Sequence, residues 1–462
     1  MKTLTATKKL IVLFVASIFV LSCSNDDDGP APFVPTDSIV ELAQDTPQLS
    51  ILVDALTKFP DLVNTLSGNG TFTVFAPNND AFAALLTAIG QTSLDDIPEP
   101  VLRSVLEYHV AASAALTSGQ VSPGTLTMVS GEVANITSDG TNLFIDGAQI
   151  IAVDGLATNG VVHIIDSVIV PPSILPIVGT IVAPAYFNKN FTTLIAAVQN
   201  ANTDVLSVLL GNGTGNGLTL FAPTNAAFEA AGITDVNGQD AVLTYHVVDG
   251  TITADMLPTT MGSAAEIGTV GGANFYLSNN GGPVTINGTT AVTTPNIAGS
   301  NGVVHVIDNV LIPPTQNIVE IVSEFASGDP AEFTMLAAAL TRANLLSTFE
   351  GAGPFTVFAP TDMAFMNAGF ADVAAIEAAA PEALAPILTH HVVKASAHVF
   401  SSDLADGDVE MLNDQNVGIS VSNLTVQDAA GSTPPAGLIP SLLNVHATNG
   451  VVHVIDKVLL PE

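Results

Sequence analysis

The segment NGVVHIID occupies residues 159–166, and it returns as NGVVHVID at residues 301–308 and 449–456. Each copy runs on into an apolar stretch that ends at a proline. The copies are spaced by roughly 140 to 150 residues, which is the length of an ordinary domain. A repeat of that length indicates tandem domains rather than a solenoid of short units.

Two further motifs accompany this segment in every unit, always in the same order. The first is FTVFAP at residues 72–77, LTLFAP at 218–223 and FTVFAP at 355–360. The second is a dipeptide between the other two motifs, namely Tyr108-His109, Tyr245-His246 and His390-His391. We therefore divide the chain into a leader at 1–22, a tether at 23–36 and three domains at 37–172, 173–314 and 315–462.

The FTVFAP motif is predicted to lie between two helices. Apolar residues at helical spacing precede it, which is typical of an amphipathic helix. The motif itself alternates and is rich in β-forming residues, so it predicts a strand that ends at its proline. A second helix is expected to begin at once. Its predicted N-caps are Asn78, Thr224 and Thr361. The phenylalanines expected to turn inward from it are Phe82, Phe228 and Phe365.

The NGVVHIID motif is predicted to form a tight Asn-Gly turn with positive φ, followed by a strand buried on both faces. A histidine in such an apolar run is expected to be buried and hydrogen-bonded to a backbone group of the facing loop. A metal ligand or a general base is the alternative function for it. The residues of this structural motif are Asn159, His163, Asn301, His305, Asn449 and His453.

Helix signals lie mainly in the first half of each unit and strand signals in the second, so the fold class is predicted to be α+β. The second unit departs from the pattern. Its interval from Pro223 to His246 is eight or nine residues shorter than the corresponding intervals in the other two units. That length is about two and a half turns of helix. We therefore predict a missing or truncated helix in the second domain.

The N-terminal residues indicate export. Lys8 and Lys9 precede a 12-residue apolar run at 10–21, which is too short to span a bilayer and is typical of a signal peptide. The run ends at Ser22-Cys23, which resembles the lipobox of bacterial lipoproteins. Cys23 is therefore predicted to be acylated and to be the only contact with the membrane.

Residues 23–36 are acidic and rich in proline and glycine, and such a stretch is expected to be an extended tether. It also resembles the acidic export tag of surface lipoproteins in the Bacteroidetes. We expect the protein to be anchored in a bacterial outer membrane at the cell surface, with a periplasm-facing orientation as the alternative.

Composition and motifs exclude several functions. Nine Lys and Arg against 43 Asp and Glu give a net charge of −34, which argues against binding to nucleic acid. A single cysteine excludes an intrachain disulfide and a thiolate metal cluster. His163 and Asp166 lie on opposite faces of one strand, and no motif of a hydrolase, zinc protease or phosphate loop occurs. We expect no catalytic residue, no cofactor and no metal. The histidines of the third unit that could gather a metal are irregularly spaced, namely His390, His391, His398 and His446.

Taken together, the three motifs resemble those of tandem fasciclin domains, from about residue 37 to residue 462. The segments FAP(T/N)(N/D)xAF and NGVVH(V/I)ID are similar to the two characteristic segments of that family, and the Tyr-His pair to the dipeptide between them. The resemblance implies a wedge of two β-sheets with several helices packed along its edge. It also implies extracellular adhesion or matrix-type binding, without catalysis and without an obligatory cofactor.

The resemblance further implies that adhesion involves the Tyr-His pair, which falls here on Tyr108-His109 and Tyr245-His246. The third unit departs, because it has His390-His391. From the residues alone, the alternative is that the pair fixes a helix–strand junction by hydrogen bonds. If the pair is adhesive, replacing Tyr108 and Tyr245 by alanine is expected to reduce adhesion without unfolding the chain.

Two functions from different classes follow. The first is a lipid-anchored adhesion or matrix-binding protein, whose partner is an extracellular matrix or cell-surface protein or glycan. The second is a capture protein for a small apolar or polysaccharide ligand, held between sheet and helices.

Overall fold

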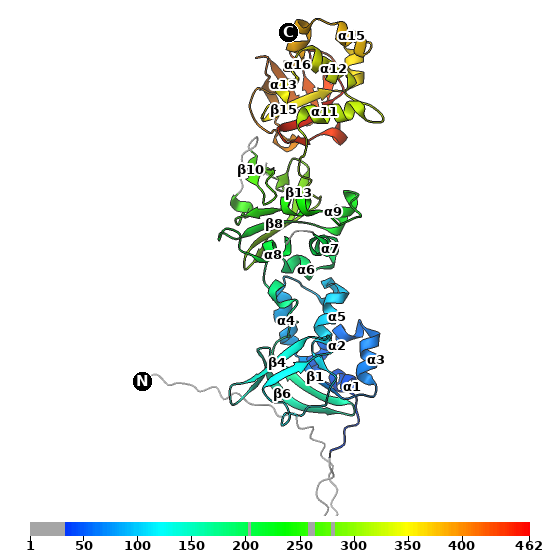
Figure 1. Cartoon of the computed structure of the whole chain (residues 1–462), viewed down its shortest axis with the longest axis vertical. Coiled ribbons are helices and arrows are strands. Elements are labelled where there is room, and N and C mark those ends of the chain that lie inside the picture. The colour runs from blue at the N-terminus through cyan, green and yellow to red at the C-terminus, as the bar shows by residue number, and fades with distance from the viewer. Residues whose placement is uncertain (1–32, 202–204, 257–263, 279–281) are drawn as a thin grey trace, which may run out of the picture. The chain divides into compact units, whose positions relative to one another are not determined.

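The computed structural model describes residues 33–201, 205–256, 264–278 and 282–462 (Figure 1). Cys23 and the predicted signal peptide lie outside these residues. The chain forms two compact units, of which the first ends at Thr192 and the second runs from Thr193 to Glu462. We call the three repeated domains the first, second and third modules. Among the described residues, no helix combines the length and the apolarity needed to cross a bilayer.

The first compact unit extends about twenty residues beyond the boundary that the repeat predicts. This extra segment contains η3 (Leu175–Ile177), α6 (Ala183–Tyr186) and η4 (Lys189–Phe191). Hydrogen bonds explain the difference, because Gln91 Nε2 donates to Pro184 O (3.3 Å) and Lys189 Nζ donates to Asp95 O (2.9 Å). The connection after the first module therefore packs against that module.

The first module begins with helices and ends with strands. Its helices are α1 (Ile39–Gln44), η1 (Pro47–Leu49), α2 (Ser50–Thr57), α3 (Pro60–Ser67), α4 (Asn79–Ala88), η2 (Leu94–Asp96) and α5 (Glu99–Glu107). Its strands are β1 (Phe72–Pro77), β2 (Val110–Ala111), β3 (Gly124–Thr127), β4 (Val133–Ser138), β5 (Leu143–Ile145), β6 (Ala148–Ala157) and β7 (Gly160–Ile165).

The two sequence motifs of the first module form the centre of its sheet. The strand order is β2-β1-β7-β6-β5-β4-β3, and β1 pairs with β7 in parallel, with Phe75 opposite His163. The long strand β6 has register shifts between Ile150 and Gly155. Such bulges bend a strand, so β6 pairs with β7 in one half of the sheet and with β5 in the other. This bend produces the wedge.

The second module has the same topology, with strand order β10-β11-β12-β13-β14-β8-β9. Its helices are α7 (Thr192–Asn200), α8 (Val205–Leu210), α9 (Asn225–Ala230), α10 (Asp240–Tyr245) and η5 (Ala254–Met256). Its strands are β8 (Leu218–Pro223), β9 (Val247–Asp249), β10 (Ala265–Gly268), β11 (Asn274–Ser278), β12 (Thr285–Ile286), β13 (Thr290–Gly299) and β14 (Gly302–Ile307).

The third module divides the same wedge into two sheets, β15-β21-β20 and β16-β17-β18-β19. A short helix, η7, stands where the other modules have the middle of a single long strand, and its Pro440 has no N–H for a sheet. The helices are α11 (Ile318–Ser327), α12 (Thr334–Arg342), α13 (Leu346–Phe349), α14 (Asp362–Asn367), α15 (Val373–Ala378), α16 (Pro381–Thr389), η6 (Ser401–Asp403) and η7 (Pro440–Leu442). The strands are β15 (Phe355–Pro360), β16 (Gly407–Glu410), β17 (Asn416–Ser420), β18 (Thr425–Gln427), β19 (Ala436–Gly437), β20 (Val445–Ala447) and β21 (Gly450–Ile455).

The helix that follows FTVFAP begins where the sequence predicts it. In each module the predicted cap accepts a hydrogen bond from the backbone N–H three residues on, and this confirms Asn78, Thr224 and Thr361. The inward turn of Phe82, Phe228 and Phe365 is also confirmed, because all three are buried.

In the second module α10 has six residues, whereas α5 and α16 have nine each, and α9 and α10 follow one another without a helix between them.

The glycine of NGVVHIID is needed for a different reason from the one predicted. We expected a turn with positive φ in every copy, but only Gly302 has one (151°). A Cβ on Gly160 would lie 2.3 Å from Phe72 O, and a Cβ on Gly450 would lie 2.2 Å from Phe355 O. Glycine is therefore required because the neighbouring parallel strand approaches closely.

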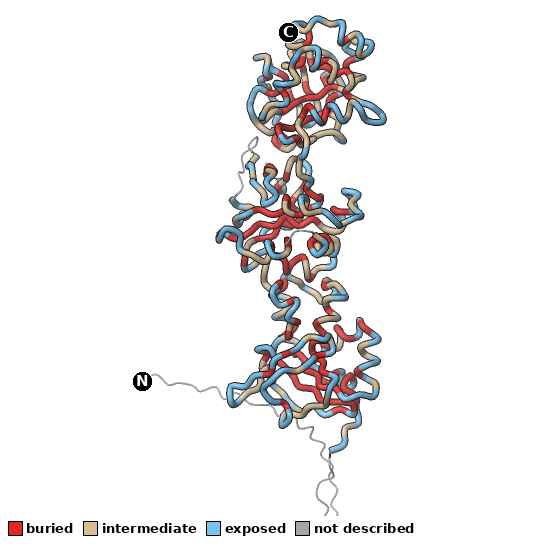
Figure 2. The backbone as a smooth tube through the Cα atoms, in the orientation of Figure 1, coloured by how far each residue is buried: buried red, intermediate tan, exposed pale blue. Residues whose placement is uncertain are grey.

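The central strands of each module are buried on both faces, as Figure 2 shows by the red tube along them. Apolar clusters lie on the two sides of the sheet. In the third module one cluster gathers Leu336, Phe365 and Val452 on the helical side, and the other gathers Phe358, Val417 and Ile455 inside the strand wedge. In the first module, His109 lies on the helical side beside Leu106, and His163 packs against Phe75 on the wedge side.

Candidate functional site

The histidine of the Tyr-His dipeptide joins a helix end to the chain after the central strand. His109 Nδ1 lies 2.7 Å from Val105 O, and His109 Nε2 accepts from Ile169 N at 3.1 Å. The first contact makes Nδ1 the protonated nitrogen and the second makes Nε2 the acceptor. The other modules repeat both bonds, with His246 on Val242 O (2.7 Å) and Leu311 N (2.9 Å), and with His391 on Ile387 O (2.8 Å) and Leu459 N (2.9 Å).

These three imidazoles are neutral in the fold. Burial lowers the pKa of His109, His246 and His391 to about 4, although the hydrogen bond to the helix carbonyl works in the opposite direction. Both ring nitrogens already have backbone partners. The histidines therefore have neither the protonation equilibrium nor the free lone pair that a general base at neutral pH requires.

The histidine of NGVVHIID is satisfied in the same manner on the other side of the sheet. His163 Nε2 lies 2.8 Å from Leu116 O, and His163 Nδ1 accepts from Asp154 N at 3.4 Å. The corresponding partners are Ile252 O (2.8 Å) and Asn296 N (3.3 Å) for His305, and Val399 O (2.8 Å) and Asn444 N (3.3 Å) for His453. Burial lowers the pKa of all three rings, that of His453 to about 4.

A left-handed residue supports each of these rings, at the bulge of the long strand in the first two modules and directly before β20 in the third. Asp154, Asn296 and Asn444 have φ of 61°, 62° and 60°. Asp and Asn tolerate this conformation better than other non-glycine residues. Their side chains accept from the facing loop, at Ser118 N (2.7 Å), Ala254 N (2.9 Å) and Ser401 N (2.7 Å). Histidine, bulge and loop thus form one repeated polar network.

The asparagine of NGVVHIID ties the helices to the sheet. Asn159 Oδ1 accepts from Ile39 N at the start of α1, and its Nδ2 donates to Leu66 O (2.7 Å) and Gly68 O (2.9 Å) at the end of α3. Asn449 makes the same set, and the Nδ2 of Asn301 donates to two helix-end carbonyls. The sequence indicated only a turn here, since it does not reveal partners about ninety residues away.

The first residue of the dipeptide lies inside the strand wedge. The Tyr108 hydroxyl donates to Asp146 Oδ2 at 2.6 Å, and the Tyr245 hydroxyl donates to Asn274 O at 2.8 Å. His390 occupies the same place in the third module, where its Nδ1 lies 3.0 Å from Asn413 Oδ1. All three side chains have no exposed surface.

This burial does not fit the assignment of Tyr108, His109, Tyr245, His246, His390 and His391 to direct adhesive contact. Their exposed fractions lie between 0% and 3%. The expectation that alanine at Tyr108 and Tyr245 would spare the fold also needs correction. Truncating a fully buried tyrosine leaves a cavity and unpaired polar groups, and such changes cost several kcal/mol (about 3–5).

Two small cavities lie beside the helices of the first module. In the first module a cavity of about 20 Å³ lies next to His109 and is lined by residues such as Leu52, Leu106 and Val162. A second cavity, of about 30 Å³, borders Leu42 and Val153. Small-molecule pockets usually measure about 300–1,000 Å³. Each cavity has room for about one water molecule.

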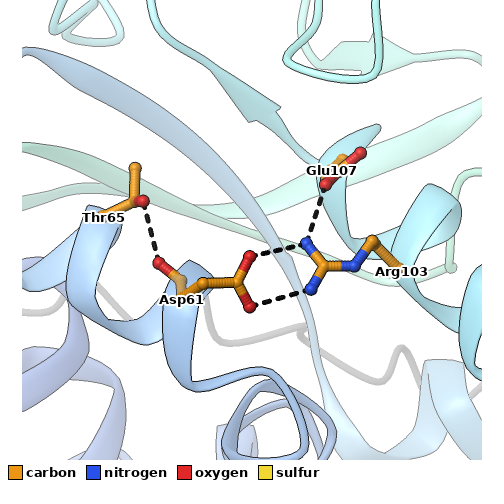
Figure 3. A network of polar contacts seen from close by, with 4 residues as sticks. All are labelled: Asp61, Thr65, Arg103 and Glu107. Atoms are coloured by element: carbon orange, nitrogen blue, oxygen red, sulfur yellow. Dashed lines mark hydrogen bonds and ion pairs between the residues drawn. The ribbon is translucent and has the colours of Figure 1, made fainter.

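The first module also has a charge cluster on its surface, next to the helix that ends at the Tyr-His pair (Figure 3). Arg103 binds Asp61 with two bonds of 2.8 and 2.9 Å and reaches Glu107 at 3.3 Å. Its guanidinium lies 4.8 Å from the ring centre of Phe59, and its hydrogen bonds lower the pKa of Asp61. The cluster joins α3 to α5. Because the cluster is solvated, its ion pairs contribute little to stability, and we assign it only the structural role of this link.

His163 and Asp166 do not form a catalytic dyad, and no metal-type cluster forms in the described ranges. The carboxylate of Asp166 accepts from Gln149 N at 2.8 Å and does not bond to His163. Within residues 33–201, 205–256, 264–278 and 282–462, no three metal-ligating side chains of the His, Cys, Asp and Glu types gather. His398 and His446 instead pack around Tyr276 of the second module. The sequence analysis missed that contact, although aromatic residues at positions where the other modules have none were a usable signal.

Comparison with known proteins identifies the repeated unit. The fasciclin domain family model matches residues 47–171, 189–313 and 331–461. The chain therefore belongs to the fasciclin domain family, and it has three tandem fasciclin domains of mixed helices and sheets.

Similar proteins occur in animals and bacteria. The chain is 28% identical to transforming growth factor-beta-induced protein ig-h3 of Sus scrofa over 406 residues, which cover 86% of this chain and 54% of that protein. It is 28% identical to periostin of Homo sapiens over 408 residues, with 86% and 44% covered. It is 41% identical to protein sll1483 of Synechocystis over 135 residues, with 29% and 74% covered. The chain thus spans about half the length of the two animal relatives.

Proposed function

We propose that this chain is a lipid-anchored adhesion protein without catalytic activity, whose modules present exposed surfaces to an extracellular matrix or cell-surface partner. Fasciclin domains are known in adhesion proteins, which supports this class of function. One observation carries the proposal furthest. The polar side chains that recur in all three modules are buried and hydrogen-bonded to the backbone, so they hold the fold and are not available for chemistry.

The exposed surface that differs between modules is therefore the better candidate for adhesion. In the first module three apolar residues of β6, Ile151, Val153 and Leu156, are 39%, 40% and 36% exposed. We call them the β6 strip. The equivalent positions of the second module are Thr293, Pro295 and Ala298, as the shared bond from the bulge residue to the strand histidine shows. An apolar strip favours contact with a protein partner.

Bead adhesion tests this proposal. Beads coated with the chain from Cys23 onward are expected to bind cells or matrix from the native environment. Replacing Ile151 and Val153 by serine is expected to reduce bead retention several-fold, whereas Thr293→Ser at the equivalent site of the second module leaves it unchanged. Circular dichroism checks the fold of both variants. Beads that bind none of these surfaces would refute adhesion.

The membrane anchor is a second part of the proposal, and it rests on Cys23 and the apolar run before it. Mass spectrometry of the native N-terminal peptide is expected to show acyl chains on Cys23, and Cys23→Ser should release the protein from the membrane fraction. Protease treatment of intact cells then separates a surface location, in which the modules are cleaved, from a periplasm-facing one.

The two cavities beside the helices of the first module are too small for a small-molecule ligand, which favours adhesion over capture at that place. Native mass spectrometry of the purified chain distinguishes the two. We expect the bare mass of the acylated polypeptide. A stoichiometric additional mass would favour a capture protein instead.

A further inference from the structure

Within the second compact unit, the second and third modules are in direct contact. Tyr276 of β11 lies against His398, with ring centres 4.3 Å apart and planes inclined by 27°. Phe400 and His446 complete an aromatic cluster around Tyr276, at 5.5 and 5.8 Å. Tyr276 is 7% exposed and Phe400 is fully buried. We call this cluster the Tyr276 joint.

Hydrogen bonds between the modules surround the joint. Ser278 Oγ donates to Asp403 Oδ1 at 2.6 Å, and both residues are buried. Asn444 Nδ2 donates to Gly288 O at 3.3 Å, so the residue that supports the strand histidine of the third module also contacts the second module. Gly288 lies so close that an added Cβ would be 2.7 Å from Phe400 Cβ.

The residues of the joint depart from the repeat. The backbone carbonyl that contacts the strand histidine aligns His398 and Phe400 with Ala115 and Thr117 of the first module. The equivalent residues of the second module are Thr251 and Thr253. By the same alignment, His446 corresponds to Leu156 and Ala298, and Tyr276 corresponds to Asn135 and Gly418. The aromatic side chains thus occur only where these two modules meet.

Two of the three rings that receive Tyr276 are imidazoles, and both titrate. His398 and His446 lie 6.0 Å apart, so two protons would place two like charges in a partly buried cluster. The buried Nδ1 of His446 has no hydrogen-bond partner in the described part of the chain. An unprotonated Nδ1 costs little free energy at that position, whereas a protonated Nδ1 of a charged ring without an acceptor costs much more.

The other charged or titratable groups of the joint have defined partners. Glu266 of β10 lies 3.3 Å from the Tyr276 hydroxyl, which is also 3.4 Å from His398 Nε2. Glu266 is therefore the one carboxylate described here that favours a charged His398. Asp403 of η6 accepts from Ser278, and His453 of β21 is bonded to Val399 O and Asn444 N. Burial outweighs Glu266 and lowers the pKa of His398, while burial and His398 together lower that of His446 to about 4.

We propose that the Tyr276 joint is a pH-sensitive contact, which holds the second and third modules together while His398 and His446 are neutral and releases them when these residues gain protons. The direction in which docking changes with pH follows from the lowered pKa values of His398 and His446. A base whose pKa is lowered in the docked state keeps its full contribution above its ordinary value and loses it as the pH falls toward the docked value. If the pKa of His446 returns from about 4 to 6.5 on release, docking weakens about ten-fold at pH 5.5 from this residue alone.

Spin-label distances in the full chain test the proposal. Cys23→Ser removes the native thiol, and Glu229→Cys and Glu377→Cys place labels on exposed helical sites of the two modules. We expect a narrow distance distribution at pH 7.5 and a broad one at pH 5.5. A second pair within the third module, Glu377→Cys and Asp408→Cys, should keep its distance at both pH values and so shows that the module stays folded.

Three variants make the result decisive. The double variant with His398→Phe and His446→Phe keeps two aromatic rings that cannot be protonated. Its distance distribution should remain narrow at pH 5.5. His446→Leu, which installs the residue of the first module, should weaken the pH response without abolishing it. Tyr276→Ala should be broad at both pH values. Identical distributions at the two pH values in the parent chain, or a double phenylalanine variant that broadens as the parent does, would overturn the proposal. A Tyr276→Ala chain that stays narrow would do so as well.

Discussion

The two residues of the central dipeptide behave differently across the modules. The second residue is always histidine, and it makes the same two backbone hydrogen bonds three times. The first residue is tyrosine in two modules and histidine in the third. Both tyrosine hydroxyls contact equivalent backbone carbonyls, Val133 O at 3.1 Å and Asn274 O at 2.8 Å, but their side-chain partners differ, and His390 contacts Asn413 instead. Both positions are buried, so burial alone does not explain the difference.

The difference lies in what each side chain must satisfy. The second position bridges a helix carbonyl and a backbone N–H, and a neutral imidazole offers a donor on one ring nitrogen and an acceptor on the other. The first position reaches into the strand wedge, where the side chain that contacts it is a carboxylate, Asp146, in the first module and an amide, Asn287 or Asn413, in the other two. The backbone partners therefore favour histidine at the second position. The first position accepts tyrosine or histidine, because the side chains around it differ between the modules.

The largest expected effect comes from removing the invariant ring. His109→Ala leaves the Val105 carbonyl and the Ile169 N–H without partners and opens a cavity. We expect a loss of about 3–4 kcal/mol in the free energy of unfolding of the first module. His391→Ala should cost the third module a similar amount. Calorimetry of the full chain measures both, with the exposed helical site Thr87→Ala as the control. Very different costs in the two modules would contradict an equivalent role.

The next effect is acid destabilisation of every module. The pKa of His109, His246, His391 and His453 is about 4 in the fold, below the ordinary 6.5, so these residues fold as neutral groups. Their contribution is complete above pH 6.5 and is lost as the pH falls toward 4. Each is expected to cost about 2 kcal/mol at pH 5. Urea unfolding at pH 7, 6 and 5 measures the trend.

The exposed carboxylates allow a check on this pH dependence, because they respond over a different pH interval. Exposed carboxylates with lowered pKa values, such as Asp61 and Glu41, lose their contribution only at more acidic pH, so they do not produce a decline between pH 6.5 and 5. A midpoint that stays constant over this interval would show that the imidazoles are not neutral in the fold.

The variable position gives smaller and unequal effects. Tyr108→Phe removes a bond to the Asp146 carboxylate, and we expect a loss of about 2 kcal/mol because hydrogen bonds to charged groups are the stronger ones. Tyr245→Phe removes a bond to a neutral carbonyl and should cost about 1 kcal/mol. Calorimetric midpoints of the two modules measure the contrast. Equal costs would indicate that the carboxylate is paired elsewhere in the variant.

Sequence patterns predicted those parts of this fold that depend on neighbours along the chain. The strand, its proline and the N-cap of FTVFAP are local, and so is the alternation that buries His163. The role of Asn159 was not local, because its partners at Ile39 and Leu66 are distant in sequence. The close approach of Phe72 O to Gly160 could not be read either, since it requires the strand pairing.

The Tyr276 joint shows a kind of contact that alignment of the three modules does not predict. Aligning the modules draws attention to the residues that they share, and these hold each module together. Tyr276 and His398 are shared by no other module, so the alignment treats them as variation. Contacts between modules must be specific to one pair, and residues that break the repeat are the ones that can supply this specificity.

The smallest expected effect is on adhesion itself. Tyr245→Phe keeps the buried ring and removes a hydroxyl that is bonded to Asn274 O inside the module. If adhesion uses the exposed surface, beads coated with this variant should be retained within about two-fold of the parent, in the same assay in which Ile151→Ser with Val153→Ser reduces retention. A strong loss in a Tyr245→Phe chain with an unchanged unfolding midpoint would mean that the hydroxyl meets the partner directly. The Tyr-His pair would then be an adhesive site that opens on binding, rather than an internal support.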